Sequence, residues 1–179
     1  MLPVVVPLQM SKHDVSGFVV GLLLAAPLMA TAVMIPFLSL FIVWVGLEKA
    51  IMISNIGGSI SSTLLGIGLC LEDRAAFLAM TTVFLMIFGI CFSLNITAEN
   101  VLLLRYSPKE DRERNIGYFR AATGVGSAFS PVLVSICLLF SDYWLCFLFV
   151  AVCLSIATPF IYLNLVYARD TFNKEASRE

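Results

Sequence analysis

The chain has 179 residues, of which 60% are hydrophobic and only 13% are charged, and its mean hydropathy is +0.96. A soluble domain carries roughly 25% charged residues, so this composition excludes one and predicts a protein that lies in a lipid bilayer. The net charge of −1 gives no electrostatic basis for binding nucleic acid, and no nucleic-acid partner is expected.

Charged residues divide the sequence into five apolar intervals, each with more than 20 uncharged residues. A helix needs about 20 residues to cross a hydrocarbon core of about 30 Å. The intervals are continuously apolar, whereas the strands of a membrane barrel alternate apolar and polar residues. We therefore expect an all-α fold, a polytopic membrane helix bundle within 16–168. The predicted transmembrane helices cover 16–45, 50–70, 75–104, 117–140 and 143–167.

Lysine and arginine set the expected orientation, because cytoplasmic loops carry an excess of both. With the N-terminus outside, two basic residues, Lys12 and Arg74, lie on the outer side. The cytoplasmic side then holds Lys49, Arg105, Lys109, Arg112, Arg114, Arg120, Arg169, Lys174 and Arg178. Residues 1–15 are thus expected to be extracytoplasmic, and 169–179 to form a cytoplasmic tail.

The second predicted helix carries a polar patch in "SNIGGSISST", which begins with Asn55 after Ser54 and continues through Ser59 and Thr63. Such side chains hydrogen-bond to neighbouring helices in membranes. Contact with a transported substrate is a second interpretation of Asn55.

The third predicted helix contains Glu99, with Asn95 four residues before it. A carboxylate inside a membrane is costly and is by default a functional hypothesis, as a proton relay or cation contact. The alternative, which we favour, places Glu99 near the cytoplasmic interface, hydrated or paired with a loop arginine. Glu99, Asn95 and Asn55 are the candidate transport residues.

The fourth predicted helix follows a charged loop, "RYSPKEDRERNIGYFR", and opens with small residues. Gly117, Ala121, Gly124, Ala128 and Pro131 recur at spacings of four and three, which places them on one helix face. Small residues let membrane helices approach closely, so this face is expected to pack against another helix.

The same stretch resembles the entry to the fifth helix of the major facilitator superfamily, whose members carry a pattern G-x-x-x-G-P-x-x-G-G. Gly126, Ser130 and Pro131 match its first half, with serine in place of the second glycine. On this resemblance the five helices correspond to helices two to six of the family's amino-terminal half. Placement in the carboxy-terminal half is the alternative, because the two halves are repeats.

Two other places resemble family patterns but lack their charges. Aligned on Pro36, the pattern P-x-x-G-x-L-x-D-R-x-G finds Val43 for the aspartate, Trp44 for the arginine, and Gly46 in its expected place beside Lys49. In the fourth family helix a pattern R-x-x-x-G is matched by Leu85 and Gly89, so its arginine is missing. These losses put the family's usual proton-coupled gating in doubt.

The resemblance implies secondary transport of a small solute by alternating access. Members usually have twelve helices, so the chain is expected to be a partial or reduced transporter that works with the missing half or another chain. The alternative function is a transport-inactive membrane interaction protein that associates through small-residue helix faces. No nucleophile, metal cluster or phosphate loop is recognisable, so neither an enzyme nor a cofactor or metal site is expected.

Overall fold

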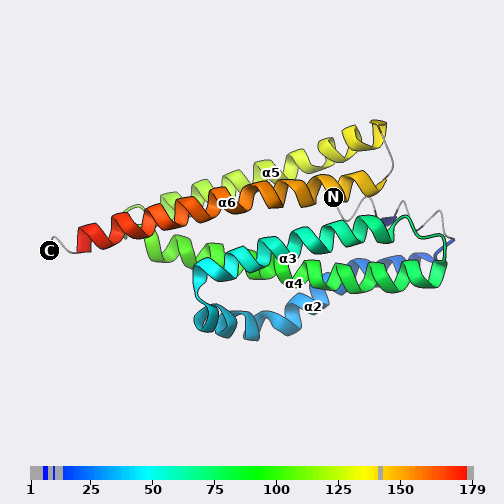
Figure 1. Cartoon of the computed structure of the whole chain (residues 1–179), viewed down its shortest axis with the longest axis horizontal. Helices are drawn as coiled ribbons and strands as arrows, with labels where there is room; N and C mark the ends of the chain where they lie inside the picture. The colour runs from blue at the N-terminus through cyan, green and yellow to red at the C-terminus, as the bar shows by residue number, and fades with distance from the viewer. Residues whose placement is uncertain (1–5, 8–9, 11–13, 141–142, 177–179) are drawn as a thin grey trace.

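The computed structural model describes residues 6–7, 10, 14–140 and 143–176, and in this part of the chain it is helical without strands. The five helices are long and apolar enough to cross a membrane, which confirms the predicted all-α membrane bundle. They are α2 (Gly17–Val45), α3 (Leu47–Gly68), α4 (Arg74–Tyr106), α5 (Arg112–Phe140) and α6 (Tyr143–Ala176), arranged as shown in Figure 1.

Helix α3 occupies the centre of the bundle, between α4 on one side and α6 on the other (Figure 1). A glycine of α3 lets this helix come close to α6, because a Cβ atom at Gly66 would lie 3.1 Å from the backbone oxygen of Trp144. Helix α2 packs mainly on α4, and α5 lies at the edge of the bundle with few neighbours. This order makes α3 the most buried helix and α5 the most exposed.

The turns between α2, α3 and α4 are short because each helix end is fixed locally. Gly46 alone separates α2 from α3, and its φ of +93° and ψ of +148° form a conformation that side chains strongly disfavour. At the start of α4, the Asp73 side chain accepts a hydrogen bond of 2.8 Å from the Ala76 amide and caps the helix. Neighbouring helices are therefore antiparallel.

Two apolar clusters fill the bundle, one toward each end. The first includes residues of all five helices together with Val6 and Met10, which are fully buried. The second joins α2, α3 and α4, and its buried members are Leu38, Ile42, Leu47, Ala50, Ile51, Leu94 and Ala98. Val134 is the buried residue of α5 among those whose side chains are described, and it belongs to the first cluster.

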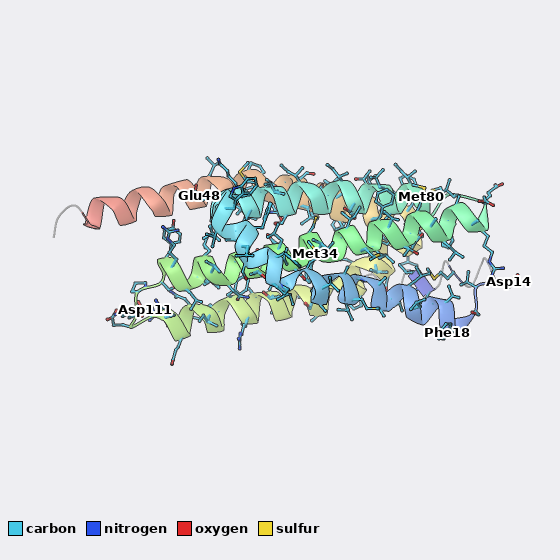
Figure 2. All side chains as sticks on the ribbon, turned by 90° about the horizontal axis from the view of Figure 1, so that it is seen from below. Asp14, Phe18, Met34, Glu48, Met80 and Asp111 are labelled. Atoms are coloured by element: carbon cyan, nitrogen blue, oxygen red, sulfur yellow. The ribbon has the colours of Figure 1, made fainter. Side chains whose placement is uncertain are left out.

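The connections alternate between the two ends of the bundle. Figure 2 shows Asp14 and Phe18 at one end, with Glu48 and Asp111 toward the other. At the first end the Arg74 side chain donates a hydrogen bond of 3.4 Å to the backbone oxygen of Asp14, which links the N-terminal segment to the turn before α4. The basic residues predict that the end with Glu48 and Asp111 faces the cytoplasm.

Large apolar side chains cover the outside of the bundle (Figure 2). Val43 and Trp44 are each 84% exposed, and Phe18 is 82% exposed. Soluble proteins rarely expose contiguous apolar surface of this extent, whereas lipid tails contact it without penalty. The outer surface is therefore a lipid-contacting one.

The predicted charged loop is largely helical. Its non-helical part is limited to Ser107–Asp111, while Arg105 lies in the last turn of α4 and the run from Arg112 to Arg120 forms the start of α5. Arginine and glutamate favour helices, and Arg114 pairs with Asp111 at 3.0 Å across one turn. The structure differs from the predicted loop because charged residues are kept out of the bilayer but readily extend helices beyond it.

Candidate functional site

The polar patch of α3 faces two different helices. Toward α4, the single hydroxyl proton of Ser54 is shared between Asn95 Oδ1 at 3.0 Å and the backbone oxygen of Ile51, one turn earlier in α3, at 2.8 Å. Toward α6, Ser59 Oγ donates to the backbone oxygen of Ala151 at 2.6 Å, and Ser62 Oγ donates to that of Phe147 at 2.8 Å. The predicted interhelical hydrogen bonds are thus confirmed, and they attach α3 to both neighbours.

Asn95 connects the patch to Glu99. Its Nδ2 donates to Glu99 Oε1 at 2.9 Å, while its Oδ1 accepts from Ser54, so the three side chains form one hydrogen-bonded chain across α3 and α4. Glu99 is half-buried, and within the described residues its carboxylate pairs with Asn95 and with no arginine. The structure therefore brings together two of the three candidate transport residues.

The lengths of the helices give the depth in the membrane of the hydrogen-bonded side chains Ser54, Asn95 and Glu99. With a rise of 1.5 Å per residue, the 22 residues of α3 span about 33 Å, close to the hydrocarbon thickness of about 30 Å. Ser54 and its partner Asn95 then lie about 10 Å from the end of α3 that begins at Leu47. Glu99 lies one helical turn, or about 6 Å, closer to that end. The polar chain thus leads from just inside one membrane surface into the hydrocarbon core.

Asn55 does not join this chain. Its side chain is only 3% exposed, and its Nδ2 has no hydrogen-bond partner among the described residues. A buried amide that lacks a partner costs free energy, and more so where water is excluded. Asn55 therefore lies in the interior beside Ser54 and Ser59, apart from the Asn95–Glu99 pair.

The small-residue face of α5 has no partner within the described chain. A Cβ atom added at Gly117, Gly124 or Gly126 would meet nothing within 4 Å, and Ala121, Ala128 and Pro131 are exposed. Ser130 belongs to the same helix, but its side chain lies outside the described ones. The packing role of this face stays a prediction, and any helix that covers it is not one of α2, α3, α4 or α6.

A close helix crossing lies at Gly89, where α4 meets Pro27 of α2. A Cβ atom at Gly89 would lie 2.6 Å from Pro27 Cβ and 2.7 Å from its backbone oxygen. Thr31 Oγ1 donates to the Gly89 oxygen at 3.1 Å and accepts from Ser93 Oγ at 2.9 Å, which fixes the crossing. Sequence reasoning noted Gly89 only as a family position and missed Thr31 and Ser93, because no local spacing marks where two distant helices cross.

The positions that lack the family's charges have two different surroundings. Leu85, which stands where the family carries an arginine, is fully buried in the first apolar cluster together with Val6, Met10 and Phe77. Val43 and Trp44 face outward near the end of α2. The interior around Leu85 is therefore apolar, at the position where the family pattern has an arginine.

Three of the predicted cytoplasmic basic residues make contacts around the α4–α5 connection: Arg105, Arg112 and Arg114. Arg112 donates to the backbone oxygen of Leu104 at 2.9 Å, and Arg105 lies 5.8 Å from the ring centre of Tyr106. Arg114 pairs with Asp111, and Lys49 lies exposed in the first turn of α3. These contacts cap helix ends and hold the connection together, which is consistent with an anchor at the membrane surface.

A comparison with protein-family profiles matches residues 1–179 to one family, the Major Facilitator Superfamily. Neither a search of curated proteins nor a search of solved structures gave a match. The matched residues cover the whole chain, and the helical membrane bundle agrees with this family. The chain belongs to the Major Facilitator Superfamily.

Proposed function

We propose that this chain moves a small solute across the membrane by alternating access, as a secondary transporter and not as an enzyme. The observation that carries the proposal is the hydrogen-bonded chain from Ser54 through Asn95 to Glu99. An ionisable residue in a transmembrane helix is expensive to keep, and such residues mark solute and ion paths. Membership of the Major Facilitator Superfamily supports the same function.

In this proposal Glu99 binds the solute or a coupling cation at the cytoplasmic mouth of the path. Asn95 donates to Oε1, and no described residue donates to Oε2, so the carboxylate keeps acceptor capacity for an incoming group. The depth of Glu99 near one membrane surface makes it reachable from water, while Asn95 and Ser54 continue the polar path inward. The proposed orientation, with the N-terminus outside, makes this the cytoplasmic surface.

Transport by this family uses a pathway between two halves. The five helices resemble helices two to six of one half, and we propose that further helices, in this or another chain, complete the pathway. Because the family's charges near Val43, Trp44 and Leu85 are absent, coupling would depend on Glu99 instead.

The experiment purifies the chain from its native membrane together with any chain that co-purifies, reconstitutes the complex in liposomes that contain a pH-sensitive dye, and applies a panel of sugars, amino acids, organic acids and cations. We expect solute-dependent proton or solute flux, reduced at least about tenfold in Glu99→Gln, because an amide cannot release a proton and has no negative charge to attract a cation. Glu113→Gln, at an exposed position in the first turn of α5, is the matched control and should keep the flux. Equal flux in wild type and Glu99→Gln would exclude the role of Glu99.

A second candidate function is a transport-inactive membrane interaction protein. The observation that favours it is the open face of α5, where Gly117 and Gly124 have no neighbour in the described chain. The same liposomes separate the two functions. A folded chain that gives no flux with any solute, but whose association with another membrane chain is weakened by Gly124→Leu and not by Val125→Leu, would support this second function.

A further inference from the structure

The charge of Glu99 is not compensated by a basic side chain. Among the described residues its carboxylate forms no ion pair, and it accepts one hydrogen bond, from Asn95 Nδ2 at 2.9 Å. The nearest basic residue along α4, Arg105, lies 5.8 Å from the centre of the Tyr106 ring. Because an unpaired carboxylate in a membrane helix is costly, a ligand of this site is expected to carry a positive charge.

The second carboxylate oxygen of Glu99 is open to a ligand. No described residue donates to Oε2, and this oxygen is not enclosed by protein. The buried side-chain atoms that lack a partner among the described residues belong to Asn55, Thr81 and Arg112 instead. The next residue on α4, Asn100, is exposed, so the side of the helix beside Glu99 is polar and accessible.

The orientation of the Asn95 amide determines which kind of cation fits. A carboxylate only accepts hydrogen bonds, so the end of the amide that faces Glu99 is the NH2 group. The other end, Oδ1, faces α3 and accepts the hydroxyl proton that Ser54 shares with its own helix. The amide oxygen is therefore directed away from the carboxylate and does not lie beside it as a second ligand.

This arrangement fits a nitrogen cation better than a metal ion. Hard metal ions are held by several oxygen ligands at once, and within the described part of the chain no cluster of metal-ligating side chains is present. An ammonium or guanidinium group brings its own N–H donors and needs an acceptor, which Oε2 provides. Hydrogen bonds between such a cation and a carboxylate are about twice as strong as those between neutral groups.

We propose that Glu99 binds a cation that carries N–H donors, a primary ammonium or guanidinium group, and that Asn95 determines this specificity. Asn95 occupies Oε1 with a donor and so denies a metal ion the pair of oxygens it would need. The proposal rests on the proposed function in one respect, because it takes Glu99 as the residue that binds the solute.

The test measures the unfolding temperature of the purified full chain, with any chain that co-purifies, in increasing methylammonium chloride at constant ionic strength. Tetramethylammonium, which has no N–H donor, replaces methylammonium to keep the ionic strength constant, and sodium and calcium chloride are tested in parallel. We expect methylammonium to raise the unfolding temperature saturably, as a ligand of the folded state does, and the other three cations to have no saturable effect. Glu99→Gln should abolish the methylammonium effect.

Asn95→Asp tests the source of the specificity. It keeps the shape of the side chain but places an oxygen beside Oε1, so calcium should now stabilise the chain, with an affinity at least about tenfold above that of the wild type. Asn100→Asp is the matched control, because it adds the same charge to α4 beside Glu99 at an exposed position outside the hydrogen-bonded chain. It should bind calcium no better than the wild type does.

Three results would overturn the proposal: equal stabilisation of the wild type by methylammonium and tetramethylammonium, stronger stabilisation by sodium or calcium, or no stabilisation that depends on Glu99. If Asn95→Asp does not fold, the comparison of the four cations in the wild type decides alone. The outcome is separable from that of the flux experiment. Flux of a neutral or anionic solute that depends on Glu99, without methylammonium binding, would overturn only this proposal, whereas methylammonium binding without any flux would overturn only the transport function.

Discussion

The glycines of α5 and the glycine of α4 differ both in their sequence context and in their surroundings. Gly117, Gly124 and Gly126 form part of a regular small-residue pattern, yet nothing described lies within 4 Å of a Cβ added there. Gly89 belongs to no such pattern, yet α2 crosses α4 in direct backbone contact at this point. A periodic small-residue face therefore shows where another helix could pack. An isolated glycine, by contrast, can mark a place where another helix already packs.

The largest effect is expected at the crossing. Gly89→Leu should lower the free energy of unfolding by about 3 kcal/mol or more, because overpacking costs about 1–3 kcal/mol even where neighbours can move, and Pro27 presents backbone atoms here. The measurement is thermal or denaturant unfolding of the purified chain in micelles. Gly124→Leu makes the same change on α5, where a side chain meets open space, and should stabilise the chain by up to about 1 kcal/mol through its higher helix propensity. Equal losses in the two variants would remove the contrast between the helices.

An intermediate effect is expected at Gly46. Gly46→Ala should cost about 1–3 kcal/mol, because its positive φ with extended ψ is a backbone conformation that nearly all residues other than glycine avoid. Gly117→Ala is the control on α5, where the glycine is helical and surrounded by open space, and it should stabilise the helix by up to about 1 kcal/mol. In unfolding experiments, Gly46→Ala is therefore expected to lower the free energy of unfolding and Gly117→Ala to raise it. A neutral Gly46→Ala would mean that the α2–α3 joint can adopt another conformation.

The smallest effect is expected for the interhelical hydrogen bonds. Ser62→Ala removes the bond from α3 to the Phe147 oxygen of α6 and should cost about 0.6 kcal/mol, the average for such bonds in membrane proteins. Ser135→Ala removes a bond within α5 only and should be neutral by the same unfolding measurement. A neutral Ser62→Ala would show that apolar packing alone holds α3 against α6.

Hydropathy was sufficient to predict the helices, because crossing a bilayer requires a long apolar run in each one. The predicted spans agree with the observed helices in number and order, but α5 begins at Arg112 and not at 117. The reason is physical: membrane insertion limits charge inside the bilayer and does not limit helix formation outside it. Helix ends beyond the bilayer depend on turns such as the one at Pro108, where the Asp111 amide donates to the Pro108 oxygen at 3.2 Å.

The candidate site was only partly predictable. The spacing of Asn95 and Glu99 places them one turn apart on one helix, which is a local property, and they are hydrogen-bonded as that spacing suggests. Their link to Ser54, and the separation of Asn55 from them, depend on which face of α3 meets α4 and which meets α6. That choice is made by the packing of the whole bundle, so it is not encoded in any short stretch.

Helix α3 is the shortest of the five, with 22 residues, while α4 and α6 have 33 and 34. The longer helices tolerate a thicker bilayer by drawing in part of their protruding ends, but α3 is held between the single-residue joint at Gly46 and the short turn before α4. A bilayer much thicker than about 30 Å would pull Glu48 and Lys49 toward hydrocarbon, at a cost of a fraction of a kcal/mol per ångström of mismatch. The length of the central helix, about 33 Å, is therefore the feature of the bundle that most limits the bilayer thickness it can match.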